Sequence, residues 1–112
     1  MSATKYDQVV EKGTTEVLIL GAGFIGDLVG ADVLTGTPTA PSPTSPDSAL
    51  VVSSVAKLTT TTTIRGVSHA ANQAVTFTVS AGTAGVSYDI QVTCATVNGA
   101  TLSHLAQVNV VP

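Results

Sequence analysis

The stretch AVTFTVSAGTAGVSYDIQVTC, residues 74–94, decides the fold, because apolar and polar side chains alternate strictly on both sides of a glycine-rich turn. A period of two residues is typical of an antiparallel strand with one buried face. Gly82 and Gly85 interrupt the alternation and mark the connection between two such strands. The predicted inward-facing residues are Val75, Phe77, Val79, Val86, Tyr88, Ile90, Val92 and Cys94.

The segment TVNGATLSHLAQVNVV, residues 96–111, continues this pattern as a hairpin around Asn98-Gly99. A two-residue loop would place the apolar side chains of the last strand on the polar face of its neighbour. A three-residue turn over residues 97–99, with Gly99 in the left-handed conformation, restores the match and sets Ile90 opposite Ala106. We therefore predict the three-residue turn.

The rest of the chain also consists of short extended segments. Four of the five prolines lie between Pro38 and Pro46, which predicts either a stiff linker or an edge strand that runs into a turn. Residues 49–58 and 59–67 are two further strand candidates, the second because β-branched threonines favour extended chain. No helix of ordinary length is predicted after residue 13.

These elements predict an all-β fold, a small immunoglobulin-like antiparallel β-sandwich. Residues 1–15 are polar and show no clear period. We expect an extended N-terminal arm over residues 1–36, with a short apolar strand and a glycine-rich turn, and the sandwich over residues 37–112.

The N-terminal segment EVLILGAGFIG, residues 16–26, carries the spacing G-x-G-x-x-G of dinucleotide-binding enzymes. That motif requires a helix to begin at its third glycine, because the first helical amides hold the pyrophosphate. Gly30, Gly36 and Pro38 interrupt the segment that would form this helix. We interpret the motif as a strand followed by a glycine-rich turn, and we expect no cofactor.

The composition excludes several function classes. The chain has 112 residues, a net charge of −3 and one cysteine, so we predict neither a nucleic-acid-binding surface nor an internal disulfide. It lacks a signal-peptide pattern and an apolar run long enough for a membrane helix, which predicts cytoplasmic synthesis and no membrane partner. Of the 11 charged residues, only Lys57, Arg65 and Asp89 follow position 47, a distribution that favours a surface covered by neighbouring subunits.

The remaining candidates for chemistry are His69, His104, Cys94 and Asp89. His104 falls on the apolar side of the last strand and is expected to approach Val92 or Cys94. No further ligands complete a zinc set, so we expect packing roles, no metal and no catalysis. We predict a loop position for His69. Tyr88 is expected to be structural, its hydroxyl capping the preceding turn.

The order of these features resembles a family of small immunoglobulin-like virion proteins of tailed bacteriophages, of the fibre–tail adaptor or head–tail structural type. The resemblance covers residues 16–111 and rests on three stretches: VGADVLTGTPTA (29–40), VTFTVSAGTAGVSYDIQVTC (75–94) and residues 96–111. The segment SAGTAGVSYDIQV is the most specific, and it is similar to the pattern S-G-G-x-x-G-x-x-Y-x-V-x. Many members carry a tryptophan after the first strand, where this chain has residues 21–25.

The resemblance implies a non-enzymatic structural protein of the virion that joins head, portal or tail to components such as fibres and is present there as a homo-oligomer. A capsid decoration protein and a carbohydrate- or surface-binding module are the alternatives. The hydroxyl groups of the threonine run are a further candidate surface for packing against a neighbouring subunit. The residues expected to contact a partner are Val17, Leu18, Ile19, Leu20, Phe24, Ile25 and Arg65.

Overall fold

The computed structural model describes residues 6–24 and 28–112, and it contains nine strands and no helix in these ranges. The strands are β1 (Gln8–Gly13), β2 (Leu18–Gly23), β3 (Leu34–Thr39), β4 (Leu50–Lys57), β5 (Thr62–Ile64), β6 (Val67–His69), β7 (Ala74–Ala81), β8 (Ser87–Thr96) and β9 (Thr101–Val111). Within the described ranges there is accordingly no helix that could cross a membrane.

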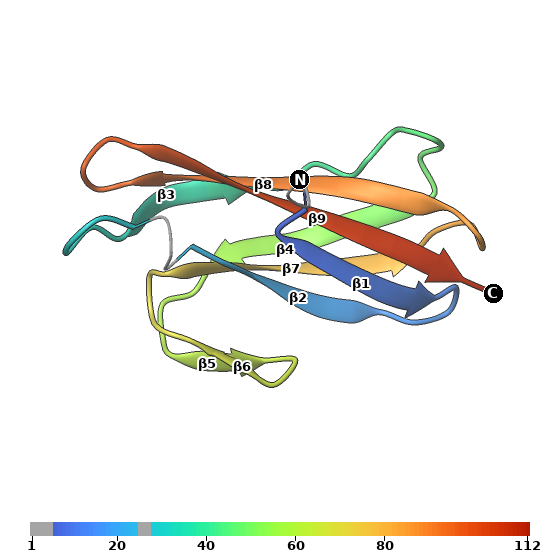
Figure 1. Cartoon of the computed structure of the whole chain (residues 1–112), viewed down its shortest axis with the longest axis horizontal. Helices are drawn as coiled ribbons and strands as arrows, with labels where there is room; N and C mark the ends of the chain where they lie inside the picture. Colours follow the sequence, from blue (N-terminus) through green and yellow to red (C-terminus); the bar gives the residue numbers. More distant parts are fainter. Residues whose placement is uncertain (1–5, 25–27) are drawn as a thin grey trace, which may run out of the picture.

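Two sheets lie face to face and enclose one apolar core (Figure 1). The first sheet has the order β1–β9–β8–β3 and the second has the order β2–β7–β4. All pairs are antiparallel except β1, which runs parallel to β9. The small hairpin β5–β6 stands outside both sheets, below β2 in Figure 1. The all-β prediction is confirmed.

The alternation in residues 74–94 produces the centre of this core. The predicted inward-facing side chains of β7 and β8 are buried, with Val86 partly buried at the edge of the core. The predicted β8–β9 register is confirmed, since Ile90 pairs with Ala106 and Tyr88 with Val108. Thr96 N–H donates to Ala100 O (2.8 Å), which leaves a three-residue turn in which Gly99 has a φ of 92°.

The corner between β7 and β8 is organised around Tyr88. The buried Tyr88 hydroxyl accepts a hydrogen bond from Thr83 N–H (2.9 Å) and donates one to the Asp47 carboxylate (2.6 Å). This bond, followed by one from Ala49 N–H and one from the Thr83 hydroxyl, lowers the pKa of Asp47. Gly82 adopts a positive φ of 99°, and a Cβ there would lie 2.8 Å from Val110 Cγ2. The backbone conformation and the lack of space therefore both require glycine.

The predicted N-terminal arm is wrong for the described part of residues 1–36. β1 is hydrogen-bonded to β9, and β2 is hydrogen-bonded to β7. Lys12 explains why the segment looked like a polar arm: its side chain points inward and is buried, and its ammonium donates to Gly13 O (2.7 Å) and Ala81 O (2.6 Å). Burial lowers the pKa of Lys12, against an opposing effect of Glu16. The expected boundary at residues 36 and 37 falls inside β3.

The proline-rich stretch supplies an edge strand, one of the two predicted options. β3 is the outer strand of its sheet, and its register with β8 shifts between Thr35 and Thr39, around Gly36 and Pro38. Proline is compatible with this position because an edge strand leaves some backbone N–H groups without a partner strand.

The predicted strand over residues 59–67 is also wrong. Its first threonines lie outside any strand, and the chain then folds back as the hairpin β5–β6. Ile64 pairs with Val67, and the two residues between them, Arg65 and Gly66, have φ angles of 50° and 82°. Two successive positive φ angles in a two-residue loop are the signature of a type I′ turn.

Candidate functional site

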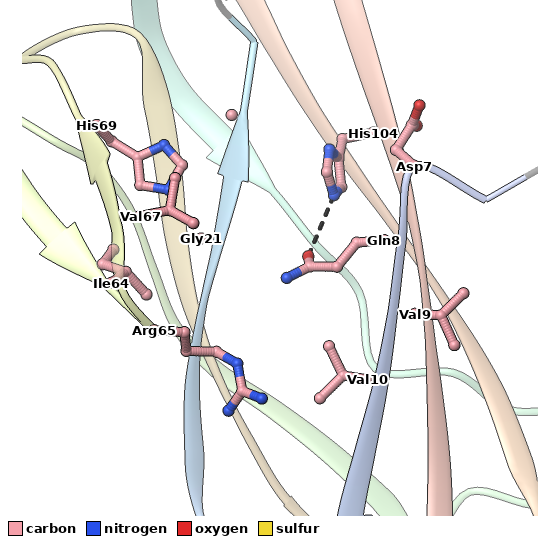
Figure 2. A pocket seen from close by; sticks show the side chains of 11 residues that line it. Asp7, Gln8, Val9, Val10, Gly21, Ile64, Arg65, Val67, His69 and His104 are labelled. Carbon is pink, nitrogen blue, oxygen red and sulfur yellow. Dashed lines mark hydrogen bonds between the residues drawn. The ribbon is translucent and has the colours of Figure 1, made fainter.

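A cleft of about 380 Å³ lies between β1, β2 and the β5–β6 hairpin (Figure 2). β2 runs through the middle of this view, with the hairpin on one side and β1 on the other. The hairpin contributes Arg65 and His69, while β1 contributes Gln8 and Val10. We call this cleft the β2 groove.

Two glycines of the G-x-G-x-x-G motif allow the hairpin to pack closely on β2. Both Gly21 and Gly23 lie within the strand, and a Cβ at Gly21 would approach His69 Nε2 to 3.0 Å and Ile64 Cδ1 to 3.3 Å. A Cβ at Gly23 would lie 3.2 Å from the His69 ring. The imidazole therefore occupies the space that side chains would fill at these two positions. The sequence prediction of a loop position for His69 is wrong, because it lies in β6 and is half-buried.

The backbone of β2 has a free edge along the groove. Phe24 N–H donates to Gln73 O on the β7 side (2.9 Å), so the alternating pattern directs the N–H and C=O groups of Leu20 and Ala22 toward β7 as well. The N–H and C=O groups of Ile19, Gly21 and Gly23 point the other way, toward the open edge.

The other three edges of the two sheets carry features that discourage further strand pairing. β3 has Pro38 and an irregular register. On β4, the Ser42 hydroxyl bonds to both Val52 N–H (2.9 Å) and Val52 O (3.3 Å), and Ser54 adopts a φ of 53° beside a register shift. On β1 the inward-pointing charge of Lys12 has the same effect. β2 has no proline, no charge and no register shift.

The histidines and the cysteine each contact other parts of the fold. His104 is buried opposite Val92, its Nε2 lies 3.3 Å from Gln8 Oε1, and its ring meets Phe24 edge to face at 6.0 Å. Cys94 is buried with its thiol 3.4 Å from Thr35 O, and burial raises its pKa, which disfavours the thiolate. No group of three His, Cys, Asp or Glu side chains within residues 6–24 and 28–112 is arranged to hold a metal ion.

The structure separates the predicted partner-contacting residues into three groups. Leu20 and Phe24 are fully buried, so the prediction is wrong for these two: they contribute to the core. Leu18 is half-buried against that core. Val17 and Ile19 are 65% and 59% exposed. Ile25 lies outside the described residues.

Arg65 lies at the tip of the type I′ turn and is exposed. Figure 2 shows its guanidinium extending from the hairpin past β2 toward β1. Among the residues that line the groove, Arg65 is the only arginine or lysine. Asp7 lies at the opposite end, and its carboxylate accepts a hydrogen bond from Leu105 N–H (2.8 Å). Arg65 thus supplies the positive charge of the groove.

Sequence reasoning missed Gln8, Val10 and His69 as groove residues. The available signal was Arg65-Gly66 between two β-branched segments, because an X-Gly pair there is compatible with a two-residue hairpin.

A scan against protein-family models finds no match for this chain, and a search of curated proteins finds no significant match.

Proposed function

We propose that this protein is a structural component of a tailed-phage virion, an adaptor that joins the head, portal or tail to neighbouring components such as fibres. It assembles in the host cytoplasm, has no catalytic role and acts as one of several identical copies. The observation that carries the proposal is the uncharged edge strand β2, which offers the exposed Ile19 and a free backbone edge beside Arg65, with the exposed Val17 directly before it.

The proposal includes an immunoglobulin-like identity for the sandwich. Its support is the strand order, in which β2–β7–β4 and β9–β8–β3 follow the B–E–D and G–F–C arrangement of such domains. A second support is Tyr88 at the start of β8, whose hydroxyl bonds back to Thr83 N–H. A tyrosine with this bond recurs at the same corner of immunoglobulin-like domains.

The outer face of the β2–β7–β4 sheet supports an assembly role. Across the strands of this sheet, Ile19 lies beside Thr78 and Ser53, and Gly21 lies beside Thr76 and Ala56. None of these six residues is charged. Surfaces that remain exposed normally carry many charges, whereas the centres of protein interfaces are depleted of them. A partner that covers these two rows of residues therefore has no charged side chain of theirs to desolvate.

The distribution of aromatic residues disfavours the carbohydrate-binding alternative. The chain has two tyrosines, two phenylalanines and no tryptophan. Tyr88, Phe24 and Phe77 are fully buried, and the Tyr6 hydroxyl is hydrogen-bonded to Asp89 (2.7 Å). A sugar-binding surface normally presents exposed aromatic rings.

The test is quantitative mass spectrometry of virions purified from a lysate of the producing host, with the major capsid protein as the reference. On the order of a dozen copies per particle, as a ring at the portal or tail requires, supports the adaptor. Copies in the hundreds replace the adaptor by a capsid decoration protein. Absence of the chain from purified virions refutes the virion assignment.

A further inference from the structure

The geometry of the β2 groove points to a specific docking mode, which rests on the proposed assembly function: the groove accepts one extended strand of a neighbouring virion subunit. The incoming strand pairs with the free edge of β2 and places an acidic side chain against Arg65. Main-chain hydrogen bonds then supply affinity, and the side chains of alternate residues supply specificity.

The free backbone groups support this docking mode. Ile19, Gly21 and Gly23 direct N–H and C=O groups toward the open edge, as the Phe24–Gln73 bond establishes. An uninterrupted edge strand without protection is a template for another chain. The two glycines carry no side chain that could shield the edge, because the space above them is taken by the His69 imidazole on the outer face of the strand.

The walls of the groove favour a single extended strand over a complete second sheet as the docking partner of β2. The hairpin stands on one side of β2 and β1 on the other (Figure 2). A folded sandwich that approached edge to edge would bring two layers of sheet against the hairpin and β1, whereas one extended chain brings a single layer. The groove thus favours a strand from a partner over self-association through β2.

The charges of the groove define the chemistry of the incoming strand. Arg65 is exposed and extends past β2 into the groove. A carboxylate on the partner strand would form a charge-assisted, two-point contact with the guanidinium. His69 lines the same side as Arg65, and the amide side chain of Gln8 lines the β1 side.

The closing experiment compares amide hydrogen exchange in the free chain and in purified virions. Docking of a strand is expected to slow exchange at Ile19, Gly21 and Gly23 by at least about tenfold, while exchange at the β3 edge stays unchanged. Equal exchange of these amides in free chain and virion overturns the docking mode and leaves the virion assignment intact. Absence of the chain from virions overturns both.

A pair of variants separates backbone pairing from side-chain contact. Ile19→Pro removes an N–H that points to the open edge and breaks no bond to β7, whereas Ile19→Thr keeps the N–H and the β-branched shape. With each variant supplied in place of the wild type, we expect Ile19→Pro to lower the copy number per virion about tenfold and Ile19→Thr to leave it within about twofold of wild type. Thermal unfolding of the purified variants verifies that both fold.

Two further outcomes complete the test. Arg65→Glu is expected to lower incorporation, and Arg65→Lys to restore part of it, because lysine retains the charge without the two-point geometry. Sedimentation of the purified chain alone is expected to show no dimer. Hydrogen exchange of the same sample is expected to show no protection of the outward-pointing β2 amides. A dimer with these amides protected would overturn the partner strand in favour of a second copy, and normal incorporation of Ile19→Pro would overturn strand pairing altogether.

Discussion

The contact between His69 and Gly21 makes a quantitative prediction about the G-x-G-x-x-G motif. A Cβ at Gly21 would lie 3.0 Å from His69 Nε2 and 3.3 Å from Ile64 Cδ1, so the alanine methyl displaces the imidazole. Overpacking of this kind costs about 1–3 kcal/mol. Replacing a strand glycine by alanine contributes about 0.5–1 kcal/mol in the opposite direction, because the unfolded chain loses freedom. Gly21→Ala is therefore expected to destabilise the fold by about 0–2.5 kcal/mol.

The destabilisation should shrink when the imidazole is absent. In a His69→Ala background only the 3.3 Å approach to Ile64 Cδ1 remains, so Gly21→Ala is expected to range from neutral to stabilising by about 1 kcal/mol. The double-mutant cycle then gives a coupling free energy of about 1–3 kcal/mol between the two positions.

The assay is equilibrium unfolding in urea of the wild type, both single variants and the double variant. Gly13→Ala is the matched control, because Gly13 also lies in a strand and its nearest contacts are atoms of Glu16. Its effect should be the same with and without His69. A coupling below about 0.5 kcal/mol between Gly21 and His69 would falsify the packing explanation of the motif.

Four further predictions concern the core and the Tyr88 corner. Ile90→Ala empties a fully buried position and should lower the free energy of unfolding by about 2–5 kcal/mol, measured in urea. Tyr88→Phe leaves Thr83 N–H without its acceptor and should cost about 1–3 kcal/mol in the same assay. Because the folded pKa of Asp47 lies below its ordinary value of 3.8, the stability advantage of wild type over Asp47→Asn should be complete well above pH 4. It should disappear as the pH falls through the lower folded pKa, and unfolding midpoints from pH 7 to pH 2 measure this. Cys94 should react with a thiol reagent such as 5,5′-dithiobis(2-nitrobenzoate) only at the rate of unfolding, and immediate reaction in native buffer would show that the thiol is accessible.

The part of the fold that could be predicted from sequence is the part that local pattern controls. In β7 and β8 every second side chain is apolar, and the parity of the β8–β9 turn follows from the same alternation. A one-residue shift would move each apolar side chain of β9 to the polar face, so the register has only one good solution.

The parts that were predicted wrongly depend on contacts between distant residues. Lys12 reads as a solvated residue, and its inward orientation becomes visible only when Ala81 O, 69 residues away, is brought beside it. The parallel pairing of β1 with β9 likewise has no local signal. In the hairpin, Arg65 occupies a positive φ of 50° that Asn, Asp or Gly more commonly adopts, so the type I′ turn was not recognised.

The two strand glycines connect the packing of the hairpin with the proposed docking of a strand. Gly21 lacks a side chain on the face that His69 covers, and its backbone N–H and C=O point to the open edge of the same strand. A substitution at Gly21 therefore alters both stability and access to the groove. Ile19 has the same backbone direction, but its side chain is exposed. Effects that substitutions at Gly21 and Ile19 share therefore report on the open backbone edge of β2. Effects seen only at Gly21 report on the packing of the β5–β6 hairpin. If the groove binds a strand, the small residues of this motif serve main-chain recognition of a peptide, whereas in dinucleotide-binding enzymes they allow the approach of a pyrophosphate.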